Sequence, residues 1–135
     1  LFLLKDGTVK AAGHNQFGQL GDGTTENKTS PVEVDITNVK QVAAGIYHSV
    51  FLLEDGSVKT VGRNHCGQLG DGTTTNKTTP TSIGLDNVKS IESGSYNTFF
   101  IMENDNIKGA GYNSFNKLNQ IDDSNLLIPQ TINLN

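Results

Sequence analysis

The sequence has a single cysteine, no cluster of basic residues, no long apolar run and no stretch of sustained helical periodicity. Because Cys66 has no second cysteine to pair with, a miniprotein stapled by disulfides is excluded. No stretch approaches the roughly 20 apolar residues of a membrane-spanning helix, so membrane insertion is not predicted. Ten basic residues stand scattered against 14 acidic ones, and nucleic acid is therefore not an expected partner.

Glycine, in contrast, is abundant, and part of it lies in a stretch that occurs twice. The octapeptide GQLGDGTT occupies residues 18–25 and, letter for letter, residues 67–74. Its G-x-x-x-x-G spacing is that of a phosphate-binding loop, but Thr24 and Thr73 stand where such a loop needs lysine. A phosphate role is therefore disfavoured, and no cofactor is expected.

The octapeptide belongs to a longer repeat that covers the whole chain. Residues 1–49 laid over 50–98 without a gap match at 26 of 49 positions, and residues 99–135 match 50–86 at 10 of 37. We interpret residues 1–135 as one repeat array, with a partial repeat at 1–40, a full repeat at 41–89 and a degenerate C-terminal repeat at 90–135. Terminal repeats often diverge because one of their faces meets solvent.

Within each repeat the pattern is one of short strands and turns. The stretch HSVFLLEDGSVKTVGRN, at 48–64, predicts two strands joined by a two-residue Asp-Gly hairpin. The stretch NVKQVAAG predicts a short strand before this hairpin, and PTSI predicts one after it, with proline suited to an edge. A repeat of 40–50 residues with about four antiparallel strands is typical of a β-propeller blade. The predicted fold class is therefore all-β.

The stretch VAAGIYHSVFLLEDGSVKTVGRNHCGQLGDGTTTNKTTP resembles the repeat of the regulator-of-chromosome-condensation family. It carries G-x-x-H-[ST], D-G-x-V, G-x-N-x-x-G-Q-L-G and a downstream proline in the order of that repeat. The resemblance implies a β-propeller, usually of seven blades. Two departures concern core packing: Ala12, Val61 and Ala110 replace a usual tryptophan, and Asn97 replaces the histidine found at His48.

At about 49 residues a repeat, 135 residues make about two and three quarter blades, whereas propellers close with about 4–8. We therefore expect an open arc or a fragment of a seven-bladed propeller. The first copy lacks the strand that NVKQVAAG supplies to the second, which would leave Phe2 and Leu3 uncovered. Self-association or further repeats would complete the propeller.

Positions shared between repeats are expected to build the blade. Glycines would form tight loops, asparagines would bond the local backbone, and leucines would pack between blades. These structural positions are Gly13, Asn15, Gly18, Leu20, Gly21, Gly45, His48, Gly62, Asn64, Gly67, Leu69, Gly70 and Gly94. His48 could instead act as a general base, but no motif places a nucleophile or carboxylate beside it.

Positions that differ between repeats are free to specialise, and they fall in two clusters, the loop GHNQF/GRNHC/GYNSF and the turn GIYH/GSYN. Tyrosine and arginine are enriched at binding hot spots, and propeller loops on one rim combine into one surface. The alternative is that the tyrosines, with Phe17 and Phe115, pack between blades. The candidate partner-binding residues are His14, Gln16, Ile46, Tyr47, Arg63, His65, Ser95, Tyr96, Tyr112 and Ser114.

The sequence holds no catalytic constellation, and neither an enzyme nor a metal site is expected. His14 and His65 occupy nearby loop positions of two repeats, but no third metal ligand accompanies them. The resemblance leaves two function classes. One is a non-enzymatic scaffold that binds a protein partner, as in bacterial members that are surface proteins or inhibitors of secreted β-lactamases. The other is a guanine-nucleotide exchange factor for a small GTPase. We favour the scaffold, and a bacterial secreted or cell-surface location over a cytoplasmic one.

Overall fold

The computed structural model of the protein describes residues 1–113 and 124–133, which form eleven β-strands and no helix. Consequently, none of these residues belongs to an apolar helix that could cross a membrane. The strands are β1 (Phe2–Leu3), β2 (Val9–Gly13), β3 (Lys28–Val34), β4 (Val39–Ala44), β5 (His48–Leu53), β6 (Val58–Gly62), β7 (Lys77–Ser82), β8 (Val88–Ser93), β9 (Asn97–Met102), β10 (Ile107–Gly111) and β11 (Leu126–Thr131). The all-β prediction is confirmed.

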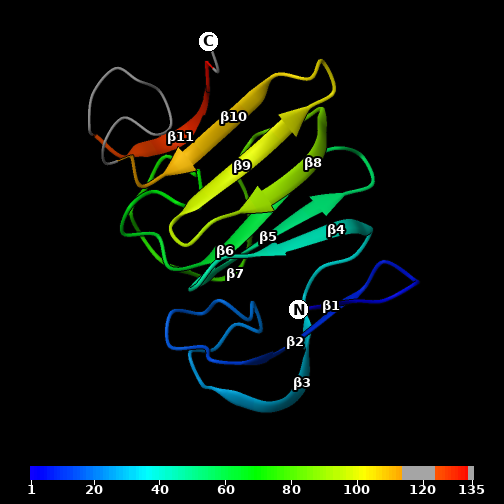
Figure 1. The fold of residues 1–135 in the computed structure, drawn as a ribbon. Helices are drawn as coiled ribbons and strands as arrows, with labels where there is room; N and C mark the ends of the chain where they lie inside the picture. The colour runs from blue at the N-terminus through cyan, green and yellow to red at the C-terminus, as the bar shows by residue number, and fades with distance from the viewer. Residues whose placement is uncertain (114–123, 134–135) are drawn as a thin grey trace.

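The strands form three antiparallel sheets that follow one another along the chain (Figure 1). Their strand orders are β1-β2-β3, β4-β5-β6-β7 and β8-β9-β10-β11. β4, the first strand of the second sheet, lies against β8, the first strand of the third. The sheets are successive blades of a partial β-propeller, in agreement with the fold predicted from the repeat. β4 begins at Val39 and β8 at Val88, so the sequence repeats counted from 41 and 90 begin inside these strands.

The Asp-Gly pair lies at the tip of a hairpin, but the loop is longer than predicted. The Leu53 N–H donates to the Ser57 carbonyl (2.9 Å), and the Gly56 N–H donates to the Leu53 carbonyl (3.0 Å). Residues 54–56 therefore lie in the loop, and the prediction of a two-residue loop is wrong. The reason is a bulge at Gly56, whose φ of +82° closes a three-residue loop. In the third blade Asp105 takes this place with φ +62°.

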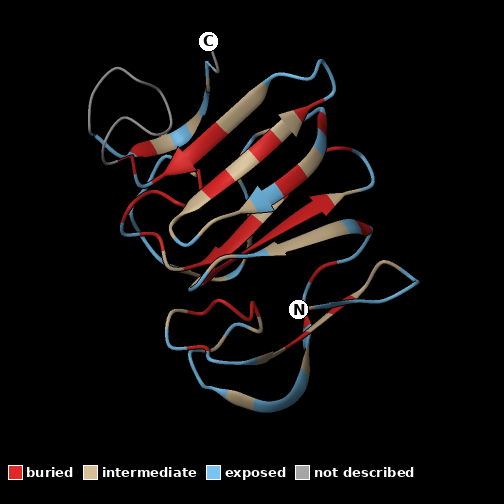
Figure 2. Cartoon of the chain, in the orientation of Figure 1, coloured by how far each residue is buried: buried red, intermediate tan, exposed pale blue. Residues whose placement is uncertain are grey.

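The hydrophobic core lies between the blades. Because successive side chains of a strand point to opposite faces, β5 contributes to two clusters. Val50 and Leu52 pack with Phe100 of the third blade, while Phe51 packs with Val9 of the first. Figure 2 shows that β5 is buried along most of its length, whereas β3 is largely exposed. The apolar run of β5 is thus explained by burial on both faces.

The first blade has three strands, and β1 pairs only with β2 among the described strands. Phe2, Leu3 and Leu4 are 51%, 37% and 39% exposed, which makes them three of the most exposed large apolar side chains of the described residues. This agrees with the exposure predicted for Phe2 and Leu3.

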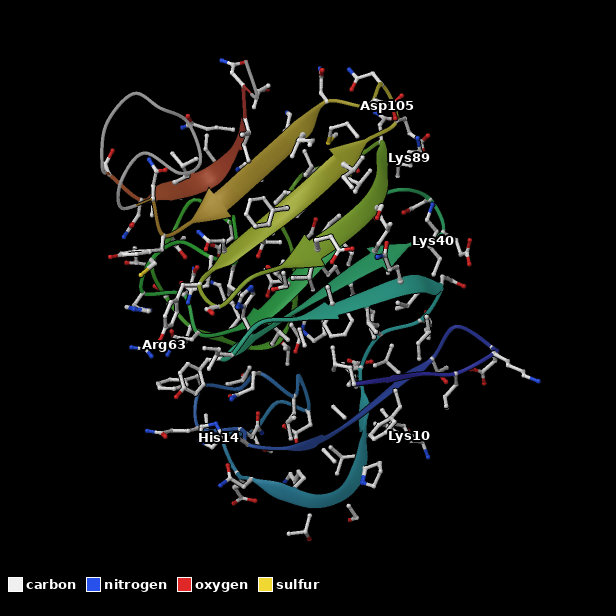
Figure 3. All side chains as sticks on the ribbon, in the orientation of Figure 1. Lys10, His14, Lys40, Arg63, Lys89 and Asp105 are labelled. Carbon is white, nitrogen blue, oxygen red and sulfur yellow. The ribbon has the colours of Figure 1, made fainter. Side chains whose placement is uncertain are left out.

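The turns of the blades gather at two opposite ends. The loop end consists of the loops 14–27 and 63–76 with the turns 45–47 and 94–96. The hairpin end consists of the hairpin tips at 4–8, 54–57 and 103–106 with the links at 35–38 and 83–87. In Figure 3, His14 and Arg63 lie toward one end, whereas Lys40, Lys89 and Asp105 lie toward the other.

Candidate functional site

A buried asparagine organises each octapeptide loop. The Oδ1 of Asn15 accepts a hydrogen bond from the Leu20 N–H (2.9 Å), and its Nδ2 donates to Oδ1 of Asp22 and to the Thr24 carbonyl (both 3.1 Å). Asn64 makes the same three bonds 49 residues later. Burial raises the pKa of Asp22, but the hydrogen bonds from Thr24 and Asn15 outweigh it and leave the pKa lowered. The ionised carboxylate inside the loop disfavours phosphate.

The octapeptide loops also join each blade to the next. The Gly23 N–H of the first loop donates to the carbonyl of Thr78 in β7 (2.9 Å), and the Gly72 N–H of the second donates to the carbonyl of Leu127 in β11 (2.8 Å). A Cβ at Gly18 would lie 2.8 Å from the Thr78 Cα. The repeated octapeptide therefore clamps the outer strand of the following blade, which accounts for its recurrence.

The other positions assigned to the blade lie in the same framework. Leu20 is 5% exposed and Leu69 is fully buried. Gly45 and Gly94 open the turns of the loop end, where their N–H groups donate to the carbonyls of residues 48 and 97. Positive φ is found at Gly13, Gly18, Gly21, Gly62, Gly67 and Gly70.

His48 links the second blade to the third. Its Nε2 lies 2.9 Å from the Ser93 hydroxyl and 3.0 Å from the Thr98 hydroxyl. The side chain is 1% exposed, and burial lowers the pKa of His48 to about 4, against a smaller opposing effect of the Asn97 backbone. It is therefore neutral at pH 7. Among the described residues no carboxylate forms a hydrogen bond or an ion pair with His48, and the arrangement is that of a buried hydrogen-bonded link.

The variable residues meet at the loop end around Arg63. The guanidinium carbon of Arg63 lies 4.7 Å from the ring centroid of Phe17, 5.4 Å from that of Tyr47 and 6.0 Å from that of Tyr96. Phe17 and Tyr47 are in edge-to-face contact with centroids 5.0 Å apart. These four residues come from three blades, and we call them the arginine–aromatic cluster. A guanidinium within about 6 Å of a ring face is attracted by its electron density.

Two histidines flank the cluster. The ring of His14 lies 5.7 Å from that of Tyr47, and its Nδ1 accepts a hydrogen bond from the side-chain amide Nε2 of Gln19 (2.8 Å). His65 contacts Tyr96 edge to face at 5.8 Å. Burial, and then the charge of Arg63, lower the pKa of His65, so this ring is neutral at pH 7. No group of three or more His, Cys, Asp or Glu residues capable of holding a metal ion occurs within residues 1–113 and 124–133.

The remaining candidates surround the cluster as exposed side chains. Ile46 is 53% exposed and Tyr112 is 40% exposed, and Gln16 and Ser95 are also exposed. Ser114 lies outside the described residues, as does Phe115. A shallow hollow of about 420 Å³ lies between the two turns and is lined by Ala44, Gly45, Ile46, Ser93, Gly94 and Ser95. The loop end thus combines aromatic, cationic and apolar groups on one surface.

Two models of the regulator of chromosome condensation (RCC1) repeat match the sequence. One matches residues 6–52 and again residues 55–101, and the other matches residues 39–68. The chain belongs to this family. The two consecutive RCC1 matches follow the 49-residue spacing of the octapeptide.

Solved structures with the same fold come from yeast and human. Prp20p from Saccharomyces cerevisiae, reported together with its binding to Gsp1p and histones, is 23% identical with a TM-score of 0.87. A chain of the complex of Kap60 with yeast RCC1 (Prp20) is 23% identical with a TM-score of 0.84, and human WBSCR16 is 25% identical with a TM-score of 0.84. Each match covers 97% of this chain but only 34–36% of the other. The RCC1-type chain described here spans about a third of their length.

Sequence reasoning did not assign Phe17 to the partner-binding set, and it left open whether the tyrosines pack between blades. In the structure Phe17, Tyr47 and Tyr96 are half-buried, so each both packs and remains accessible. The signal available in the sequence was an aromatic residue at the same loop position in two copies, Phe17 and Phe115. What the sequence does not encode locally is that Arg63 reaches across to the loop of the preceding blade.

Proposed function

We propose that this RCC1 repeat chain is a non-enzymatic scaffold that binds a protein partner through its loop end. The observation that carries the proposal is the arginine–aromatic cluster, in which side chains of three blades meet at one accessible surface. Tyrosine and arginine are the residue types most enriched among interface hot spots. Relatives of the same fold support the proposal, because Prp20p binds Gsp1p and histones and is found in complex with Kap60.

The chemistry of the described residues supports binding over catalysis. His48, the buried titratable group nearest to two hydroxyls, is 1% exposed and its pKa is lowered to about 4 by burial. A general base works best when its pKa is near the operating pH and substrate can reach it. His48 meets neither condition. The variable side chains of the loop end are instead arranged as a contact surface.

Affinity capture with matched variants tests the scaffold. The chain is immobilised and exposed to secreted and cytoplasmic fractions of its source organism, and the captured protein is then purified and its affinity measured. Alanine at Tyr47, Arg63, Tyr96 and Tyr112 should each weaken binding, by about tenfold or more at the positions that act as hot spots. Alanine at Lys89, in an exposed ion pair at the hairpin end, is the matched control and should change little.

Melting curves of all variants separate loss of binding from loss of folding. A partner whose affinity is unchanged by all four loop-end substitutions would show that the loop end is not the binding surface. An equal loss of partner binding in the Lys89 variant would indicate that binding depends on general charge attraction.

The second candidate function is guanine-nucleotide exchange on a small GTPase. Membership of the RCC1 repeat family favours it, because the resemblance to that family implies exchange as the alternative function. The test is the release of fluorescent GDP from a small GTPase of the source organism. Acceleration at catalytic concentrations of the chain would establish exchange and contradict the scaffold, whereas an unchanged release rate is the result that the scaffold predicts.

A further inference from the structure

Arg63 is the only arginine of the sequence, and no carboxylate of residues 1–113 and 124–133 forms an ion pair with it. Four ion pairs occur in residues 1–113 and 124–133, and all of them use lysine. The guanidinium of Arg63 donates no hydrogen bond to another of the described residues. The guanidinium carbon lies over the rings of Phe17, Tyr47 and Tyr96, and its N–H groups have no acceptor among the described residues. A guanidinium carries five such donors in a planar fork.

The acidic side chains of the loop end are already engaged elsewhere. Asp22 lies 3.5 Å from the Nζ of Lys28, and Asp71 lies 3.5 Å from the Nζ of Lys77. Both carboxylates also accept hydrogen bonds from the asparagine of their own loop. Arg63 is therefore a half-buried cation for which the described part of the chain supplies no counter-charge.

We propose that the fork of Arg63 binds a side-chain carboxylate of an acidic segment in the protein partner. This inference rests on the proposed function and adds the chemistry of the partner. Carboxylate geometry matches a guanidinium bidentately, and such charge-assisted hydrogen bonds are about twice as strong as neutral ones. The surrounding rings hold the guanidinium in place, so less side-chain freedom is lost when the carboxylate binds.

The neighbouring surface indicates what accompanies the carboxylate. The hollow of about 420 Å³ between the two turns lies beside exposed Ile46, and it suits an apolar side chain of the same segment. Tyr112, 40% exposed, lies next to the turn of Tyr96, because its N–H donates to the Tyr96 carbonyl (3.0 Å). The segment that fits is therefore acidic with an adjacent apolar residue.

Selection from a phage-displayed library of random dodecapeptides tests the inference without a known partner. Phage are selected on the wild-type chain after depletion on the bare support, and binding to Arg63→Gln is measured only afterwards. Enriched peptides are made with capped ends, together with isosteres in which Asp becomes Asn and Glu becomes Gln. We expect enrichment of acidic residues next to an apolar one, and affinity about 10- to 100-fold lower for the amide isosteres and for Arg63→Gln.

Two further measurements make the assignment specific. Because the chain has one arginine, its Nε–H gives a single signal in a ¹H–¹⁵N spectrum, which should shift saturably with the acidic peptide and not with its isostere. Lys40→Gln removes the same charge from the hairpin end and should bind the peptide as the wild type does. Arg63→Lys keeps the charge but loses the fork, and should bind nearly as weakly as Arg63→Gln.

Several outcomes would overturn the inference. Peptides whose binding requires Tyr47 and Tyr96 but is unchanged in Arg63→Gln would support the scaffold proposal and contradict the proposal that Arg63 binds a carboxylate. Equal losses of peptide affinity in Lys40→Gln and Arg63→Gln would show that binding depends only on the net charge of the chain. If the wild-type chain retains no peptide from the library, the carboxylate proposal is contradicted. The affinity capture of a protein partner would still test the scaffold proposal.

Discussion

Replacing Gly67 by alanine tests whether the octapeptide clamps neighbouring blades. Gly67 has φ +75°, and a Cβ there would lie 2.6 Å from Cδ2 and 2.9 Å from Cα of Leu127, and 3.0 Å from the Leu126 carbonyl oxygen. Two of these three atoms belong to the backbone of β11 in the next blade. They cannot move aside as the end of a flexible side chain can, so the strand itself must shift.

The expected cost has two parts. A non-glycine residue in the left-handed conformation costs about 1–2 kcal/mol, and forcing an extra carbon into a packed contact costs about 1–3 kcal/mol. Gly67→Ala should therefore lower the free energy of unfolding by about 2–5 kcal/mol, a large share of the roughly 5–15 kcal/mol of a typical domain.

Gly72→Ala is the matched control, because it lies in the same loop with nearly the same conformation. Its φ is +79°, and its Cβ would meet only Cγ2 of Ile128, at 3.5 Å. It should bear the conformational cost alone, about 1–2 kcal/mol. Thermal unfolding followed by circular dichroism should place the Gly67→Ala midpoint about 4–12 °C below that of Gly72→Ala. Gly18 and Gly23 offer the same comparison in the first loop. Equal midpoints within both pairs would refute the clamp.

Three further predictions concern other parts of the chain. Because the pKa of His48 is about 4 in the folded chain and about 6.5 when unfolded, its contribution to the free energy of unfolding is complete above pH 6.5 and is lost as the pH falls toward 4, by about 3 kcal/mol in total. Urea titrations at several pH values should show this loss of stability, and the His48→Asn variant, which has the residue found at Asn97, should not show it. Phe2 and Leu3 on the unpaired edge of β1 should drive self-association; sedimentation should show it weakened by Leu3→Lys, and a wild type that stays monomeric at tens of micromolar would contradict this. Arg63→Ala should lower the free energy of unfolding by only about 1 kcal/mol in a denaturant titration, since the cation packs on half-buried rings, while it weakens partner binding by about tenfold or more. A loss of stability as large as that of Gly67→Ala would instead show that Arg63 is a structural residue.

The blade could be predicted from the sequence because its signals are local and repeated. The Asp-Gly pair marks the hairpin, and a run such as HSVFLL reads as a buried strand wherever it occurs. The hairpin loop length was wrong because the same Asp-Gly letters serve two- and three-residue loops, and the bulge at Gly56 depends on strand register. The residues of the turn alone do not determine the register of the two strands.

The site was only partly predictable for a related reason. Variable positions such as Tyr47 and Arg63 could be found by comparing repeats, and both lie at the loop end. Phe17 could not be assigned, because its contact with Arg63 joins residues 46 positions apart in different blades. Contacts between blades depend on how sheets stack, which side-chain periodicity within one repeat does not encode.

Hydrogen exchange with and without a captured partner tests most directly the claim that the loop end binds. Binding at the loop end should slow exchange in the turns 45–47 and 94–96 and in residues 63–66, which carry most of the arginine–aromatic cluster and its flanks. The hairpin tips 54–57 and 103–106 should exchange at unchanged rates, because they lie at the opposite end. Protection confined to these hairpin tips, with the turns and residues 63–66 unaffected, would contradict the account.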